Sequence, residues 1–253
     1  MSKRLIIANW KMNPTTLIEA KKIFIKSKLL SAKLKKTSII VCPPSVYLSA
    51  FRIKKSQKFS LGAQDIFWKL SGAHTGEISP LMIANLGASF CIVGHSERRI
   101  LGETDEVVSK KLRSLFKEKI TPILCVGERE RDVQGHYLET LSAQIRGSLR
   151  SVERKNASKL IIAYEPIWAI GKTADDAINP RKLHEMVIFV RKVLAQIFGA
   201  ETAKKIRILY GGSVEGKNAH ELISNGHVSG FLVGHASLDM REFSEIIKAV
   251  EKS

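Results

Sequence analysis

The chain has 253 residues, of which 44% are hydrophobic, and its formal net charge is +17. This length suffices for one large core or for two modest domains. No apolar run approaches the roughly 20 residues that span a bilayer, and residues 5–8 are too short for a signal-peptide core. The sequence therefore predicts neither a membrane-spanning segment nor a secretory leader.

Cysteine usage and charge bear on compartment and partners. Cys42, Cys91 and Cys125 are odd in number, widely spaced and form no Cys-x-x-Cys pair, which is typical of reduced thiols in a cytoplasmic protein. The excess of Lys and Arg has two interpretations. It coats solvated helix faces, or its field steers an anion, either a small phosphate or a nucleic acid. Charge alone does not separate these interpretations.

Short apolar or β-branched runs recur along the chain, each bounded by Gly, Pro or polar residues. The expected strands are residues 5–8, 38–42, 59–63, 90–93, 122–126, 160–164, 206–210 and 230–233. Several are apolar without alternation, which is typical of parallel strands buried on both faces. Helical spacing separates most of them, as in Leu183, Met186, Val187 and Val190.

Eight strand–helix units predict an α/β fold, a closed (β/α)8 or TIM barrel. No Pro- or Ser-rich linker divides residues 1–253, so we expect a single domain. The alternative, an open doubly wound sheet, normally has a glycine-rich turn after its first strand. Here that turn runs from Asn9 to Pro14 and contains no glycine, which favours the barrel.

Polar groups and glycines follow most of the expected strands. They are Asn9 and Lys11, Gln64, His95 with Glu97, Glu165, Ser213 and Gly234. In such barrels the chemistry gathers where strands run into the following loops. A single His or Glu at a strand end is more often structural. Their arrival from different strands predicts one site with a carboxylate base, an imidazole and an ammonium.

Three loops contain glycines at the same end of the expected barrel. They end at Gly171, Ser213 and Gly234. One such loop would be only a tight turn. Three together favour an anion site of backbone N–H groups, because loops after the seventh and eighth strands commonly hold phosphate.

Two patterns suggest other sites and are rejected. The sequence Gly171-Lys172-Thr173 ends like a P-loop, but Pro166 occupies the earlier glycine position. His184-Glu185 begins a His-Glu-x-x-His pattern, but Ile188 stands where the second His belongs. We therefore expect no metal site.

Five segments together resemble triosephosphate isomerase, in the family's order and across essentially the whole chain. They are residues 9–13, 94–99, 163–171, 210–214 and 230–234. The resemblance implies an intramolecular aldose–ketose isomerase of glycolysis and gluconeogenesis, acting on triose phosphates without a cofactor. It also implies a homodimer, with no specific nucleic-acid partner.

The resemblance also implies residue roles. The family uses a glutamate base and a neutral imidazole, which here would be Glu165 and His95. Lys11 would supply positive charge, with Asn9 as a supporting donor. Gly171, Ser213, Gly234 and His235 would bind phosphate.

Other residues would support the site. Glu97 would lie behind Lys11, and Tyr210 would be a further supporting residue. Trp168 would belong to the hinge of a lid over residues 166–174, and Thr75 would approach the partner's active site. A short helix expected after His95 would disfavour the imidazolium through its dipole.

Two positions depart from the family's pattern. The lid is two residues short after Gly171, which either stiffens it or is compensated by residues 175–177. His235 replaces a usual glycine. It would add strain if a positive φ is required there, would add charge beside the phosphate, or would simply be tolerated.

Three functions compete at this point. The first is the active isomerase. The second is a weakened barrel that binds nucleic acid, suggested by the charge and the short lid, although no nucleic-acid-binding motif is present. The third is another phosphosugar isomerase on the same barrel, which a substrate panel would distinguish.

Overall fold

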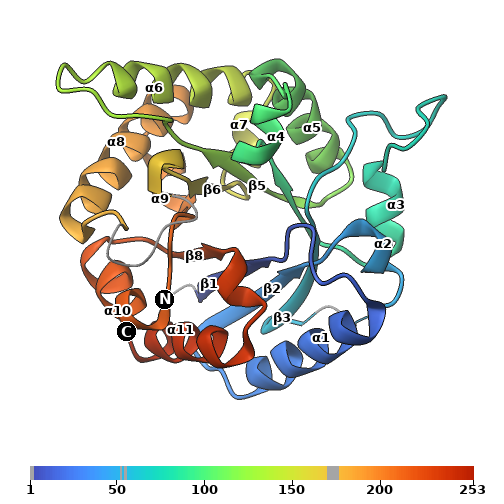
Figure 1. Ribbon diagram of the computed structural model, residues 1–253. Helices are drawn as coiled ribbons and strands as arrows, with labels where there is room; N and C mark the ends of the chain where they lie inside the picture. Colours follow the sequence, from blue (N-terminus) through green and yellow to red (C-terminus); the bar gives the residue numbers. More distant parts are fainter. Residues whose placement is uncertain (1–2, 52, 54–55, 170–176) are drawn as a thin grey trace.

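The computed structural model describes residues 3–51, 53, 56–169 and 177–253. Eight parallel strands close into a barrel in sequence order (Figure 1). They are β1 (Arg4–Asn9), β2 (Thr37–Cys42), β3 (Phe59–Ala63), β4 (Phe90–Val93), β5 (Thr121–Val126), β6 (Ile161–Tyr164), β7 (Arg207–Tyr210) and β8 (Gly230–Val233). The predicted (β/α)8 barrel is confirmed, and each predicted strand end is correct to within one residue.

Helices surround the barrel on its outside (Figure 1). The longer ones are α1 (Leu17–Ala32), α5 (Asp105–Lys117), α6 (His136–Leu149), α8 (Pro180–Phe198), α10 (Gly216–Asn225) and α11 (Met240–Lys252). The shorter ones are α2 (Ser45–Leu48), α3 (Pro80–Asn85), α4 (Ser96–Ile100), α7 (Arg154–Ala157), α9 (Ala200–Lys205), η1 (Ile167–Ala169) and η3 (His235–Ser237). The helical spacing from Leu183 to Val190 lies on the buried face of α8.

The strands are buried on both faces, which explains why they are apolar without alternation. One face of each strand fills the barrel interior, where Ile7, Ile92 and Leu232 belong to one packed cluster. The other face packs against the helices, where Ile6, Val93 and Phe231 belong to the larger cluster. This double burial fixes the strand ends, and therefore the residues that follow them.

The barrel closes between β8 and β1, and Gly230 permits that closure. Its φ is 146°, and a Cβ atom there would lie 1.8 Å from the Leu5 carbonyl oxygen. Only glycine fits so close to the neighbouring backbone. Ser229 accepts the Leu5 N–H at 3.0 Å, which extends the contact between the two strands.

In the part of the chain that the structure describes, no helix is long and apolar enough to cross a membrane. Cys42, Cys91 and Cys125 are free and buried within the barrel wall. Burial raises the pKa of all three thiols. These thiols are therefore neutral at physiological pH and are inert packing groups.

Candidate active site

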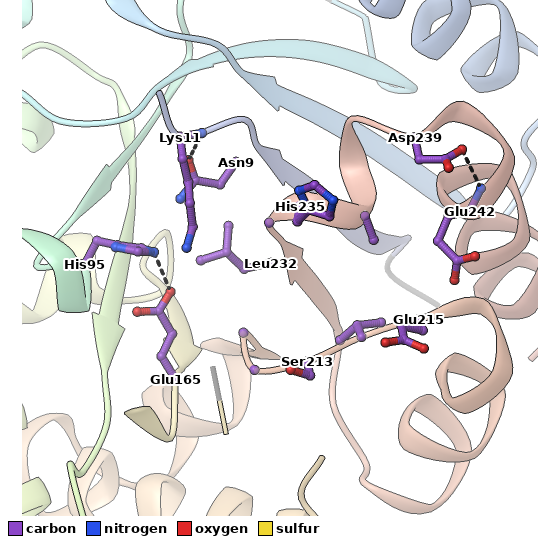
Figure 2. Close-up of a pocket in the computed structure, with 15 residues that line it drawn as sticks. Asn9, Lys11, His95, Glu165, Ser213, Glu215, Leu232, His235, Asp239 and Glu242 are labelled. Atoms are coloured by element: carbon purple, nitrogen blue, oxygen red, sulfur yellow. Dashed lines mark hydrogen bonds and ion pairs between the residues drawn. The ribbon is translucent and has the colours of Figure 1, made fainter. Parts of the chain in front are cut away.

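A cavity of about 520 Å³ opens at the carboxyl ends of the strands. Residues that follow β1, β4, β6, β7 and β8 line it, and Figure 2 shows their side chains converging on the same space. They include Asn9, Lys11, His95, Glu165, Ser213, Gly234 and His235. The structure thus brings together most of the strand-end residues that the sequence singled out. Gln64 and Glu97 line the neighbouring cavity instead, and Gly171 lies outside the described residues.

Glu165 follows β6 directly and is only 2% exposed. Its Oε2 accepts the Ser96 N–H at 3.4 Å, and its Oε1 lies 3.4 Å from His95 Nε2. Oε1 has no hydrogen-bond partner among the described residues, although it is buried. No short hydrogen bond therefore occupies the lone pairs of Oε1, which suits a proton acceptor.

His95 is the N-cap of α4, as the sequence analysis expected. Its Nδ1 accepts the Glu97 N–H at 3.2 Å. That nitrogen therefore carries a lone pair, and a neutral ring holds its proton on Nε2. Nε2 points towards the Glu165 carboxylate on the same side of the cavity (Figure 2). His95 can thus donate a hydrogen bond to a bound oxygen without being charged.

Lys11 lies in the loop after β1 with a φ of 52°, which is uncommon for a residue with a side chain. Neighbouring side chains hold this conformation. Asn9 Oδ1 accepts the Lys11 N–H at 3.1 Å, and Gln64 Nε2 donates to the Lys11 carbonyl at 2.8 Å. Lys11 Nζ lies 2.6 Å from Glu97 Oε1, so the ammonium is held at one wall of the cavity.

The loops after β7 and β8 form the opposite wall. Ser213 Oγ donates to the Ala169 carbonyl at 2.9 Å, which ties the β7 loop to η1. Gly234 precedes η3, and His235 is the first residue of that 3-10 turn. His235 is exposed at the cavity mouth and does not adopt a positive φ. The strain that a glycine-demanding position would have imposed is therefore absent.

Three carboxylates also line this wall, but each is engaged at a helix start. Asp239 accepts the N–H groups of Arg241 and Glu242 at the beginning of α11. Glu242 accepts the Gly216 N–H at 2.5 Å, and Glu215 caps α10. Helix N-termini carry partial positive charge, which offsets these carboxylates.

Trp168 precedes residues 170–176 in the chain and Ile178 follows them, whereas residues 170–176 themselves are outside the described residues. Trp168 Nε1 donates to Glu128 Oε1 at 3.0 Å, and Tyr210 Oη accepts the Ile178 N–H at 3.5 Å. Burial raises the pKa of Tyr210 to about 12, so the phenol stays neutral. The chain is thus anchored to the barrel at Trp168, near the start of the predicted lid, and at Ile178, beyond its end.

Sequence reasoning missed Glu128, which follows β5 and is 1% exposed. It accepts hydrogen bonds from the Tyr164 hydroxyl at 2.7 Å, from Arg131 Nε at 2.9 Å and from Trp168. Burial and this carboxylate raise the pKa of Tyr164, which keeps its hydroxyl a donor. The strand-end rule that found the other residues would also have found Glu128.

Replacing Glu128 with alanine is expected to lower the free energy of unfolding by about 3 kcal/mol, because the buried Tyr164 hydroxyl, the partly buried Trp168 and Arg131 lose their acceptor. Urea unfolding would measure this. Glu130→Ala, on an exposed neighbour, serves as the control and should change it by less than about 0.5 kcal/mol. Equal effects of the two substitutions would contradict the assignment.

Glycines leave room for the glutamate. A Cβ atom at Gly211 would lie 2.7 Å from Glu165 Cγ, and one at Gly127 would lie 1.9 Å from the Glu165 carbonyl oxygen. Gly211→Ala is therefore expected to displace the Glu165 carboxylate and lower kcat about 100-fold, as a misplacement of about 1 Å does. Its melting temperature should stay close to that of the parent. An unchanged kcat would contradict the crowding.

The chain resembles known proteins along nearly its whole length. The family model for triosephosphate isomerase matches residues 4–250. The chain belongs to the triosephosphate isomerase family. The triosephosphate isomerase of Dictyoglomus thermophilum is 39% identical, over 98% of this chain and 100% of that protein. That of Moorella thermoacetica is 42% identical, over 98% of each.

Family membership makes this chain an isomerase by descent. Among the described residues, no group of three or more His, Cys, Asp or Glu side chains is placed to hold a metal ion. What this triosephosphate isomerase family member offers in the cavity is the buried side chain of Glu165, the imidazole of His95 and the amino group of Lys11. These are the groups needed for proton transfer next to a carbonyl.

Proposed function

We propose that the chain interconverts dihydroxyacetone phosphate and D-glyceraldehyde 3-phosphate, a step of glycolysis and gluconeogenesis. The observation that carries the proposal is that Glu165 Oε1, which makes no hydrogen bond among the described residues, lies 3.4 Å from His95 Nε2 on one side of the cavity. Proton transfer between adjacent carbons needs a base beside the carbons and a donor beside their oxygens. Glu165 and His95 meet both needs.

The proposed chemistry begins when Glu165 takes a proton from the hydroxymethyl carbon of dihydroxyacetone phosphate. The electron pair moves onto the carbonyl oxygen and gives an enediolate, which His95 Nε2–H stabilises by hydrogen bonding. A proton passes between the two substrate oxygens through the imidazole. Glu165 then returns its proton to the neighbouring carbon, which completes the aldose and restores the carboxylate.

Positive charge and backbone donors hold the other end of the substrate. Lys11 supplies charge near the enediolate and the phosphate, and Asn9 keeps it oriented through their hydrogen bond of 3.1 Å. The N–H groups of Ser213, Gly234 and His235 are the proposed phosphate donors, together with Gly171. An exposed His235 would add charge to the phosphate when protonated.

Residues 166–174 are the proposed lid, although residues 170–176 lie outside the described part. Support comes from two anchors, Trp168 on Glu128 near the start of this segment and Ile178 on Tyr210 beyond its end. A lid closing over the cavity would exclude water and protect an intermediate that can otherwise expel phosphate.

Free, buried cysteines suit a reducing compartment, so we propose a cytoplasmic location.

A panel of phosphorylated aldoses and ketoses tests the substrate. We expect turnover of the two triose phosphates and none of pentose or hexose phosphates, because the chain belongs to the triosephosphate isomerase family. Faster turnover of a larger phosphosugar would contradict the proposal and would favour a related isomerase.

We further propose that the chain acts as a homodimer through the loop between β3 and α3. That loop projects from the barrel at the upper right of Figure 1 and exposes Thr75. Beside Lys11 lies a second cavity of about 370 Å³, lined by Glu97 and by Met12 and Leu101. Met12 is 90% and Leu101 77% exposed, and such apolar groups are typical of an interface.

Sedimentation equilibrium is expected to give twice the 28.2 kDa chain mass. Thr75→Arg should shift the mass towards that of the monomer and lower activity, because the loop would no longer fit beside the partner's Lys11. Ser71→Arg adds the same charge to an exposed residue earlier in the same loop. It therefore separates the loss of the Thr75 contact from the effect of the added charge. A fully active wild-type monomer would contradict the dimer.

A further inference from the structure

Helix α1 carries an apolar face that points into solvent. Ile18, Ile25 and Leu29 are 70%, 55% and 64% exposed. Spacings of seven and four residues place all three on one side of a helix, over a length of about 16 Å. The opposite side packs on the barrel through Ile23 and Phe24. The outward apolar side is therefore additional to the one that the core requires.

Lysines flank these apolar residues on both sides. At about 100° per residue, Lys21 and Lys28 fall on one flank of the helix, and Lys22, Lys26 and Lys33 fall on the other. All five are exposed. Glu19, exposed in the first turn of α1, is the carboxylate closest to them in sequence, and no Asp or Glu follows it from residue 20 to residue 64. We call Ile18, Ile25, Leu29 and these five lysines the α1 ridge.

We propose that the α1 ridge docks this protein reversibly on an anionic membrane surface. The three apolar side chains would enter the boundary between headgroups and acyl chains. The lysines would extend along both flanks and place their ammonium groups among lipid phosphates. The apolar crest of the ridge, which is Ile18, Ile25 and Leu29, has lysines on both sides. This arrangement matches a flat, deformable, negatively charged surface.

The composition of the ridge favours lipid over a macromolecular partner. Protein interfaces are enriched in aromatic residues and Arg and depleted in Lys, but the ridge has five Lys, no Arg and no aromatic residue. A second copy would bring lysines against lysines. Nucleic acid would meet an aliphatic crest where stacking rings are expected. Each alternative is therefore poorer in fit than an anionic bilayer.

The ridge is separate from the site and from the projecting loop. No residue of α1 lines the cavity. In Figure 1, α1 lies along the lower edge of the barrel, whereas the loop between β3 and α3 projects at the upper right. Docking through α1 would leave the cavity open to substrate. Its failure would leave the isomerase proposal intact, because the two use different residues.

Co-flotation with vesicles tests the lysines. Binding is expected to vesicles containing one-third phosphatidylglycerol at low salt, and not to pure phosphatidylcholine. Lys22→Gln/Lys26→Gln should weaken binding about 30-fold, from about fivefold for each cation near the surface. Lys182→Gln/Lys192→Gln on α8 removes the same charge from exposed positions and should leave binding nearly unchanged. Equal losses in the two variants would contradict the ridge.

A fluorescent label tests insertion of the apolar crest. Ile25 and Ile188 have matched exposures of 55% and 57%, on α1 and α8, and the native cysteines are buried. Ile25→Cys and Ile188→Cys, each carrying an environment-sensitive dye, should retain isomerase activity. Anionic vesicles should shift the emission to shorter wavelength only at position 25. Equal emission shifts at the two positions, or no shift at position 25, would overturn the proposal. So would a protein that binds an acidic peptide but not the anionic vesicles, because the partner would then be a protein.

Discussion

Replacing Glu165 with glutamine is expected to lower kcat by about 10²–10⁴-fold, the usual contribution of a positioned general base. The carboxamide keeps the size of the side chain and its place beside Ser96, but it cannot accept the carbon-bound proton. Because the phosphate donors are untouched, KM should change little. Steady-state rates in both directions, with the parent protein beside the variant, measure the effect.

Glu165→Asp is the matched comparison, because it keeps the carboxylate and shortens the side chain by one methylene. A base withdrawn by about 1 Å should cost about 100-fold in kcat. The aspartate variant should therefore retain more activity than the glutamine variant. If both variants kept the parent rate, another group would have to be the base, and the proposed role of Glu165 would be wrong.

Replacing His95 with glutamine is expected to lower kcat by about 10²–10³-fold, the usual cost of removing one oxyanion donor. The present geometry sets the imidazole through the Glu97 N–H bond of 3.2 Å to Nδ1, which leaves Nε2–H for the substrate. A glutamine at this position has no ring nitrogen held at the same place. It also cannot relay a proton between two oxygens.

His220→Gln makes the same substitution on the exposed face of α10 and should leave kcat unchanged. The substrate-concentration dependence of both variants separates binding from chemistry. If His95→Gln instead raised KM by the same factor and left kcat intact, His95 would bind substrate without stabilising the developing oxyanion.

The barrel could be predicted from the sequence because its signal is local and repeated. Double burial makes runs such as residues 160–164 apolar on both faces, and the periodicity of α8 follows from one buried face. The same regularity placed Asn9, Lys11, His95 and Glu165 at strand ends. Their convergence followed from topology without any knowledge of individual contacts.

Other features depend on contacts that the sequence does not display. The positive φ of Lys11 is held by Gln64, which lies 53 residues away. The pairing of Glu128 with Trp168 depends on a long-range approach of two loops. The strain considered for His235 could be judged only from its backbone, which starts the 3-10 turn η3. Long-range geometry decides each of these cases.

The net charge shows how far composition alone can be interpreted. The lysines of α1 do coat a solvated helix face, as one interpretation expected. The three apolar residues between them became evident only when exposure was known for each side chain. Their spacing could have been noticed from the sequence, but either face of α1 could then have been assigned to the core.

The most direct test of the central claim is the steady-state rate of D-glyceraldehyde 3-phosphate conversion by the purified protein. We expect kcat/KM near 10⁸ M⁻¹s⁻¹, about the diffusional ceiling that members of this family reach. Such a rate would also show that the shortened lid still serves catalysis. A rate no greater than that of Glu165→Gln would contradict the assignment of this cavity as a working isomerase site.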